Sequence, residues 1–102
     1  MLVNMQVMKM DVEGHELKVL QGATNLLTKH KVSFIIAEAN RDIIGLEAAY
    51  EVLTFLRNLG YRVSTKGFKG PWVTDAQVQK RTVRWRDVNV FAVHEDLWGR
   101  GL

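Results

Sequence analysis

Apolar residues along this chain fall into short runs and longer periodic segments, which predict alternating strands and helices. The stretch Val7–Asp11 has the length and composition of a short buried strand. Residues 32–37 form a nearly continuous apolar run, typical of a strand covered on both faces. Residues 61–65 alternate apolar and polar positions, and residues 88–93 are again mostly apolar. Both segments are therefore predicted to be strands.

Two helices are predicted between these strands. Residues 13–29 place their apolar side chains on one stripe of a 3.6-residue period. Residues 46–59 do the same, and Gly60 is expected to end that helix in a left-handed conformation. Asn40 and Asp42 are candidate N-terminal caps for it. The predicted apolar face of the second helix consists of Leu46, Ala49, Tyr50, Leu53 and Leu56.

The resulting order is β-α-β-α-β-loop-β, which predicts an α/β fold with a sheet covered by helices. Residues 66–86 show no regular period and contain turn residues, so they are predicted to be a long loop. Because the last strand follows a loop and no helix, we expect it to insert antiparallel. In open sheets of this type, ligands bind at the carboxyl ends of the strands.

Polar residues gather where the first two strands end. Asp11 and Glu13 follow the first strand, and Glu38 and Asn40 follow the second. If the two strands are neighbours, these side chains meet at one edge and form a candidate site. A purely structural reason exists for Glu13 and Glu16, because acidic residues stabilise a helix N-terminus. For Asp11, at the strand end itself, a functional role is favoured.

Two further residues near this edge have both a functional and a structural interpretation. Lys9 lies on the same side of the first strand as Asp11, where it can position an anionic group or form a structural ion pair. His15 falls in the first turn of the predicted helix, where exposed histidines are common. Its ordinary pKa also suits a general base at neutral pH.

Composition limits the chain to ordinary globular classes. A length of 102 residues allows one domain at most. No apolar run is long enough to span a membrane, and no basic region followed by an apolar stretch opens the sequence. There is no cysteine, so disulfide and thiolate chemistry are excluded. We expect a cytoplasmic location and no membrane partner.

The net charge of +3 is concentrated in one segment. Residues 66–86 contain six Lys or Arg and a single acidic residue, Asp75. Within that segment, residues 80–86 alternate basic side chains with Val83 and Trp85. One interpretation is a contact with nucleic acid, through phosphate pairing and aromatic stacking. The favoured interpretation is a solvated face with one buried side, so nucleic acid is not an expected partner.

The region around the first strand resembles a known family. Residues 9–16 read Lys-Met-Asp-Val-Glu-Gly-His-Glu, which resembles the Lys-x-Asp-Val-Glu-Gly-x-Glu signature of FkbM-type methyltransferases. Residues 35–38 look like that family's next strand with its terminal Glu, and Gly60-Tyr61 like its later helix-to-strand junction. The similarity is dense over residues 7–40, looser to about residue 65 and faint beyond.

The resemblance implies O-methylation that depends on S-adenosylmethionine, on a Rossmann-like fold with a seven-stranded sheet. The last two predicted strands then correspond to the family's final antiparallel pair. The acceptor is expected to be a hydroxyl of a small molecule, glycan or lipid. The implied catalytic residues are Asp11, Glu13 and Glu38, and the implied substrate-binding residues are Lys9, His15 and Glu16.

The resemblance also implies that residues 1–102 are the C-terminal half of a methyltransferase domain. The glycine-rich turn and the acidic residue that bind the cofactor belong to the other half, so we expect a fragment that is inactive alone. The first strand would then be an exposed sheet edge open to pairing. We expect self-association or a partner chain there. The alternative is a non-enzymatic α/β association module that pairs with itself or with a complete methyltransferase.

A metal site is a further possibility at the same edge. Asp11, Glu38 and Asn40 resemble the strand-end magnesium ligands of another methyltransferase group, the catechol type. Oxygen ligands suit such a hard cation. The FkbM resemblance itself does not require a metal.

Overall fold

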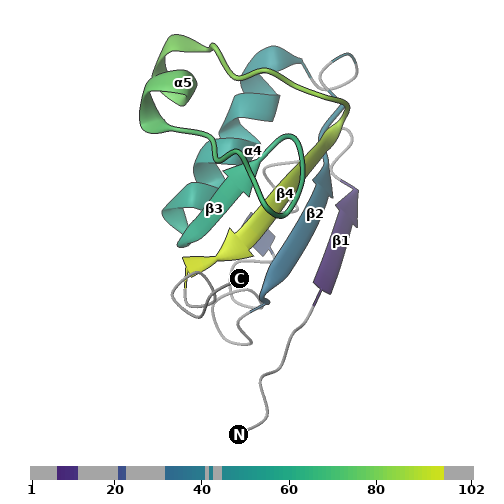
Figure 1. Ribbon diagram of the computed structural model, residues 1–102. Coiled ribbons are helices and arrows are strands. Elements are labelled where there is room, and N and C mark those ends of the chain that lie inside the picture. Colours follow the sequence, from purple (N-terminus) through teal and green to yellow (C-terminus); the bar gives the residue numbers. More distant parts are fainter. Residues whose placement is uncertain (1–6, 12–20, 23–31, 41, 43–44, 96–102) are drawn as a thin grey trace, which may run out of the picture.

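The computed structural model describes residues 7–11, 21–22, 32–40, 42 and 45–95 of the chain. Within these ranges it contains four strands and two helices (Figure 1). The elements, in chain order, are β1 (Val7–Asp11), β2 (Phe34–Glu38), α4 (Leu46–Asn58), β3 (Tyr61–Ser64), α5 (Asp75–Lys80) and β4 (Asn89–His94). The predicted strands are confirmed to within two residues at either end.

The four strands form one mixed sheet in the order β1-β2-β4-β3. β1 and β2 are parallel, whereas β4 runs antiparallel to both β2 and β3. The predicted α/β class, the antiparallel last strand and the final antiparallel pair are therefore confirmed. β4 separates β2 from β3, although these two strands are nearer to each other in the sequence. Parallel strands β1, β2 and β3 consequently end at the same edge of the sheet.

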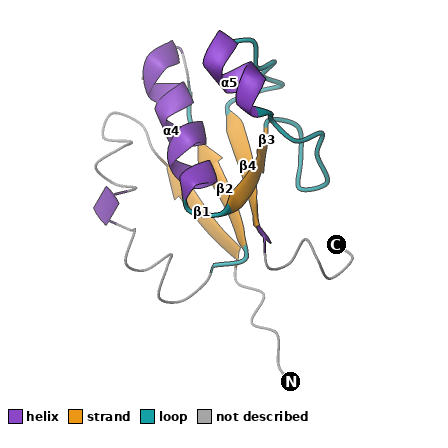
Figure 2. Ribbon diagram, turned by 90° about the vertical axis from the view of Figure 1, so that its left-hand side faces the viewer, coloured by secondary structure: helices purple, strands orange, loops and turns teal. Residues whose placement is uncertain are grey.

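The core lies between the sheet and α4, which runs along one sheet face (Figure 2). Ile35 and Ala37 of β2 and Val90 and Ala92 of β4 are fully buried. Phe34 belongs to a second buried cluster, whereas Ile36 and Glu38 are half-buried, so β2 is apolar up to its polar carboxyl end. The core-facing residues of α4 are Ala49, Tyr50, Val52, Leu53 and Leu56.

The C-terminal end of α4 is as predicted, whereas its N-terminal cap is not. Gly60, with φ of 92°, follows the helix in the expected left-handed conformation. The prediction of Asn40 or Asp42 as the N-cap is wrong, because the cap is Gly45, and no described side chain caps the helix. The Asn40 Oδ1 instead accepts a hydrogen bond from the Asp42 backbone N–H at 3.0 Å. Leu46 was also placed wrongly on the buried face; it is 48% exposed.

The loop predicted over residues 66–86 contains a six-residue helix, α5. The Thr74 hydroxyl accepts a hydrogen bond from the Gln77 N–H, and the Gln77 side chain accepts one from the Thr74 N–H. This reciprocal capping box satisfies two N–H groups that the first turn leaves unpaired. The expectation that no helix precedes the last strand is therefore wrong.

Further sequence predictions concern the first predicted helix, the edge of the sheet at β1 and membrane-spanning segments. The helix predicted over residues 13–29 lies outside the described residues, apart from residues 21 and 22, which are helical. In the described part of the chain, β1 pairs with β2 only and so lies at a sheet edge, where Val7 is 63% exposed. Over the same residues, no helix is both long and apolar enough to cross a membrane.

Replacing Tyr61 with phenylalanine is expected to lower the free energy of unfolding by about 1 kcal/mol at neutral pH. The variant should also lose less of this free energy than the wild type when the pH is raised into the alkaline range. The Tyr61 hydroxyl donates to the Val32 carbonyl at 2.5 Å, and burial raises the pKa of Tyr61 from 10.0 to about 12. A raised folded-state pKa gives stability that is complete below pH 10 and is lost as the pH rises through 12. Denaturant unfolding between neutral pH and pH 12 measures both effects. Equal alkaline slopes for the wild type and Tyr61→Phe would contradict the assignment.

Candidate functional site

Strand register brings polar residues together at the carboxyl edge of the parallel strands. Asp11 on β1 pairs with Glu38 on β2, and Glu38 pairs with Asn89 on β4. The three residues therefore stand level on adjacent strands, each about 4.8 Å from the next. The structure confirms that the first two strands are neighbours and that Asp11 and Glu38 share this edge. The backbone of Asp11 is described, but its side chain is not.

Glu38 carries a carboxylate at this edge that has no partner among the described residues. The side chain is half-buried, and it forms no hydrogen bond or ion pair within the described residues. The next residue fixes the backbone, because the Ala39 N–H donates to the Val88 carbonyl at 2.7 Å and extends the β2–β4 pairing. Glu38 thus offers a positioned carboxylate at the edge where ligands bind in open α/β sheets.

Asn89 at the start of β4 and Asp87 just before the strand are polar residues that the sequence prediction missed. Asn89 is level with Glu38, and its N–H donates to the Asp87 carboxylate at 2.7 Å. The available signal was the predicted antiparallel direction of the last strand. An antiparallel strand begins where its parallel neighbours end, so its first residues belong to the same edge.

The remaining predicted site residues are only partly placed. Lys9 is exposed on β1, two residues before Asp11 and paired in register with Ile36. Glu13, His15 and Glu16 lie outside the described residues, and their roles stay predictions.

The predicted metal ligands are also only partly described. Among the described residues, no group of three or more His, Cys, Asp or Glu side chains gathers to hold a metal. Glu38 and Asn40 supply oxygen atoms of the kind a hard cation prefers. The Asn40 Oδ1, however, already accepts the Asp42 N–H. A magnesium site formed by Asp11, Glu38 and Asn40 stays a prediction.

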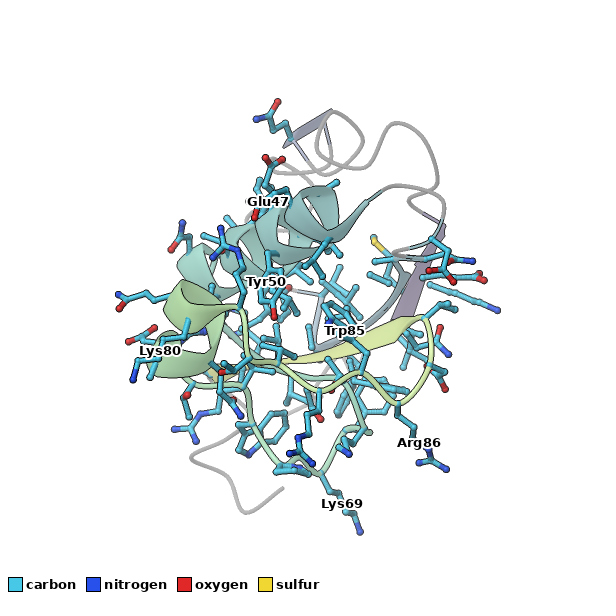
Figure 3. All side chains as sticks on the ribbon, turned by 90° about the horizontal axis from the view of Figure 1, so that it is seen from above. Glu47, Tyr50, Lys69, Lys80, Trp85 and Arg86 are labelled. Atoms are coloured by element: carbon cyan, nitrogen blue, oxygen red, sulfur yellow. The ribbon has the colours of Figure 1, made fainter. Side chains whose placement is uncertain are left out.

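Residues 82–86 of the basic segment contact the core along one side. Val83 is buried, and its N–H donates to the Tyr50 hydroxyl at 3.1 Å. The Trp85 ring packs edge-on against the Tyr50 ring, with centroids 6.1 Å apart (Figure 3). Arg84 and Arg86 are exposed between and beyond these residues. The burial therefore alternates as expected for a solvated face with one buried side.

Ion pairs hold α5 beside α4 and so position the start of this segment. Arg81 donates two hydrogen bonds of 3.0 Å to the Glu47 carboxylate and lies over the Tyr50 ring. The Arg81 guanidinium holds the pKa of Glu47 below its ordinary value. A second pair joins Arg57 of α4 to Asp75 of α5.

Comparison with known proteins gives one match. The family model described as the methyltransferase FkbM domain matches residues 4–63, more than half of the chain. The match spans β1, β2, α4 and most of β3, including Asp11 and Glu38. Searches of curated proteins and of solved structures found no match.

Proposed function

Because the chain belongs to the FkbM methyltransferase family, we propose that it forms the acceptor-binding side of an S-adenosylmethionine-dependent O-methyltransferase. The observation that carries the proposal is the half-buried Glu38 carboxylate. It stands level with Asp11 at the carboxyl edge, without a partner among the described residues. The family match covers both of these residues.

In this proposal Glu38 binds the acceptor hydroxyl by accepting its hydrogen bond. As the hydroxyl oxygen forms its bond to the methyl carbon, Glu38 takes the proton, which is general-base catalysis. Asp11, level with Glu38 on the neighbouring strand, is proposed to orient the acceptor. S-adenosylmethionine, when bound, would supply the electrophilic methyl group, and its sulfur–methyl bond would break so that S-adenosylhomocysteine leaves. We propose that the glycine-rich cofactor turn of the family comes from a polypeptide segment other than residues 1–102.

Calorimetric titration of S-adenosylmethionine into the chain tests the proposal. We expect little binding by the chain alone. After assembly with the cofactor-binding half of an FkbM-family domain, we expect stoichiometric binding and transfer of a labelled methyl group to a hydroxyl acceptor. Assembly and cofactor binding without any transfer across a panel of hydroxyl acceptors would contradict it.

The association-only alternative rests on the β1 edge. Its outer side has no strand partner among the described residues, and such an edge presents N–H and C=O groups to another chain. We propose that a second chain pairs there, whether or not methyl transfer occurs. Sedimentation of the samples used for titration should show an assembly larger than a monomer. A sharp monomer with slow amide exchange along residues 7–11 would contradict this pairing.

A further inference from the structure

A cleft of about 230 Å³ lies beside the carboxyl end of β3. Its lining residues include Lys66, Arg84 and Thr82, and none of its lining residues carries a carboxylate. The cleft is smaller than the roughly 300–1,000 Å³ of sites that enclose a whole drug-sized ligand. It therefore suits one charged group of a ligand that extends beyond the cleft.

The cations around this cleft are not neutralised by neighbouring acids. Within the described residues, Lys66, Arg84 and Arg86 form no ion pair. The only acidic residue of the basic stretch, Asp75, pairs with Arg57 of α4. Arg86 lies next to Lys66, because its Nη1 donates a hydrogen bond to the Lys66 carbonyl at 3.4 Å. Three positively charged residues consequently lie where residues 65–66 run beside residues 84–86.

Hydrogen bonds fix the two segments that carry these cations. The Thr65 hydroxyl donates to the Arg84 carbonyl at 2.5 Å and joins the segments directly. The Lys66 N–H donates to the Ser64 hydroxyl at 3.0 Å, and Ser64 is fully buried. A backbone held in this way loses little conformational freedom when a ligand binds. The backbone from which the exposed Lys66 and Arg84 side chains extend is thus fixed.

The cleft and the Glu38 carboxylate lie along the same edge of the sheet. β3, which ends just before Thr65, is separated from β2 by β4 alone. Two strand spacings correspond to about 10 Å. This spacing separates only the strand backbones, and the cleft extends further, to Val73, whose N–H donates to the Val63 carbonyl of β3. An elongated ligand is therefore needed to place an anionic group at Lys66 and Arg84 and a hydroxyl at Glu38 at the same time.

We propose that this cleft binds the phosphate or carboxylate group of the acceptor, so that the methylated substrate is an anionic hydroxyl compound. The proposal rests on the proposed function and specifies its substrate class. A small anion fits better than single-stranded nucleic acid. Base stacking needs an open aromatic face, whereas Trp85 packs against Tyr50 and the core. Trp72, which lines the cleft, packs against the buried cluster of Phe34 and Val93.

Titrations of inorganic phosphate and, separately, of acetate into the chain, followed by amide chemical shifts, test the cleft directly. We expect one or both anions to shift residues 65–67 and 82–86. Lys66→Ala and Arg84→Ala should each weaken that binding at least fivefold. Lys80→Ala is the control, because it removes the same charge from an exposed position well apart from Arg86 (Figure 3). It should change the affinity for the anion less than twofold. The anion that binds more tightly identifies the acceptor's group.

Equal weakening by all three variants would show unspecific charge attraction and overturn the proposal. Absence of shifts at the cleft with both anions would also overturn it. So would a single-stranded oligonucleotide that binds the same residues much more tightly with a steep salt dependence. The titrations need neither cofactor nor methyl transfer, so a failed cleft leaves the proposed function standing. Anion binding without methyl transfer by the assembled enzyme would count against the proposed function alone.

Discussion

Replacing Leu53 with alanine should lower the free energy of unfolding by about 2–5 kcal/mol, the usual range for deleting a buried leucine side chain. Leu53 is fully buried in α4 and belongs to the core cluster between this helix and the sheet. A small domain has a total stability of about 5–15 kcal/mol, so this loss would remove a large share of it. Urea unfolding followed by circular dichroism measures the change.

Thr54 provides the matched control for this substitution. It is the next residue of the same helix and is exposed, so Thr54→Ala should change stability by less than about 0.5 kcal/mol. A loss below about 1 kcal/mol for Leu53→Ala would mean that α4 is not packed on the sheet as described.

Replacing Glu38 with glutamine should reduce methyl transfer by the assembled enzyme by about 100-fold to 10,000-fold, the usual contribution of a general base. Glutamine keeps the size of the side chain and removes the charge that accepts the proton. Because Glu38 has no described partner to lose, the thermal unfolding midpoint should stay nearly unchanged. Initial rates with labelled S-adenosylmethionine at saturating acceptor measure the effect on the chemical step.

Glu51→Gln is the control for the loss of one negative charge. Glu51 is exposed on α4, away from the carboxyl edge of the sheet, and its replacement should leave the rate within twofold. A Glu38→Gln enzyme that retains more than a third of the wild-type rate would exclude Glu38 as the base. Asp11 would then be the next carboxylate of this edge to test.

Hydrophobic pattern was sufficient to predict the strands and α4, because both elements bury an apolar face. It was not sufficient for α5, which buries only Val78 and depends on its cap. The Thr74-x-x-Gln77 spacing was the only local signal, and it is easily overlooked beside two glycines and a proline. The exposure of Leu46 could not be predicted, since periodicity does not show where the sheet stops covering a helix.

The candidate site was predicted as far as strand order allowed. Asp11 and Glu38 could be paired because consecutive parallel strands are commonly neighbours. Asn89 was missed because its position depends on β4 inserting next to β2, a long-range arrangement. The cationic cleft was missed for a similar reason. Lys66 and Arg84 are 18 positions apart in the sequence, and they share a cleft through the Thr65–Arg84 hydrogen bond and the fold of α5.

The position of β4 between β2 and β3 also determines when the sheet can be completed during translation. β2 and β3 have no direct pairing, so each must wait for residues 89–94 before it gains that neighbour in the sheet. During translation, the segments up to about residue 88 can form α4 and a β1–β2 pair, while β3 remains without a partner strand. Completion of the sheet must therefore follow emergence of β4 from the ribosome, and until then the nascent chain is exposed to chaperones and proteases.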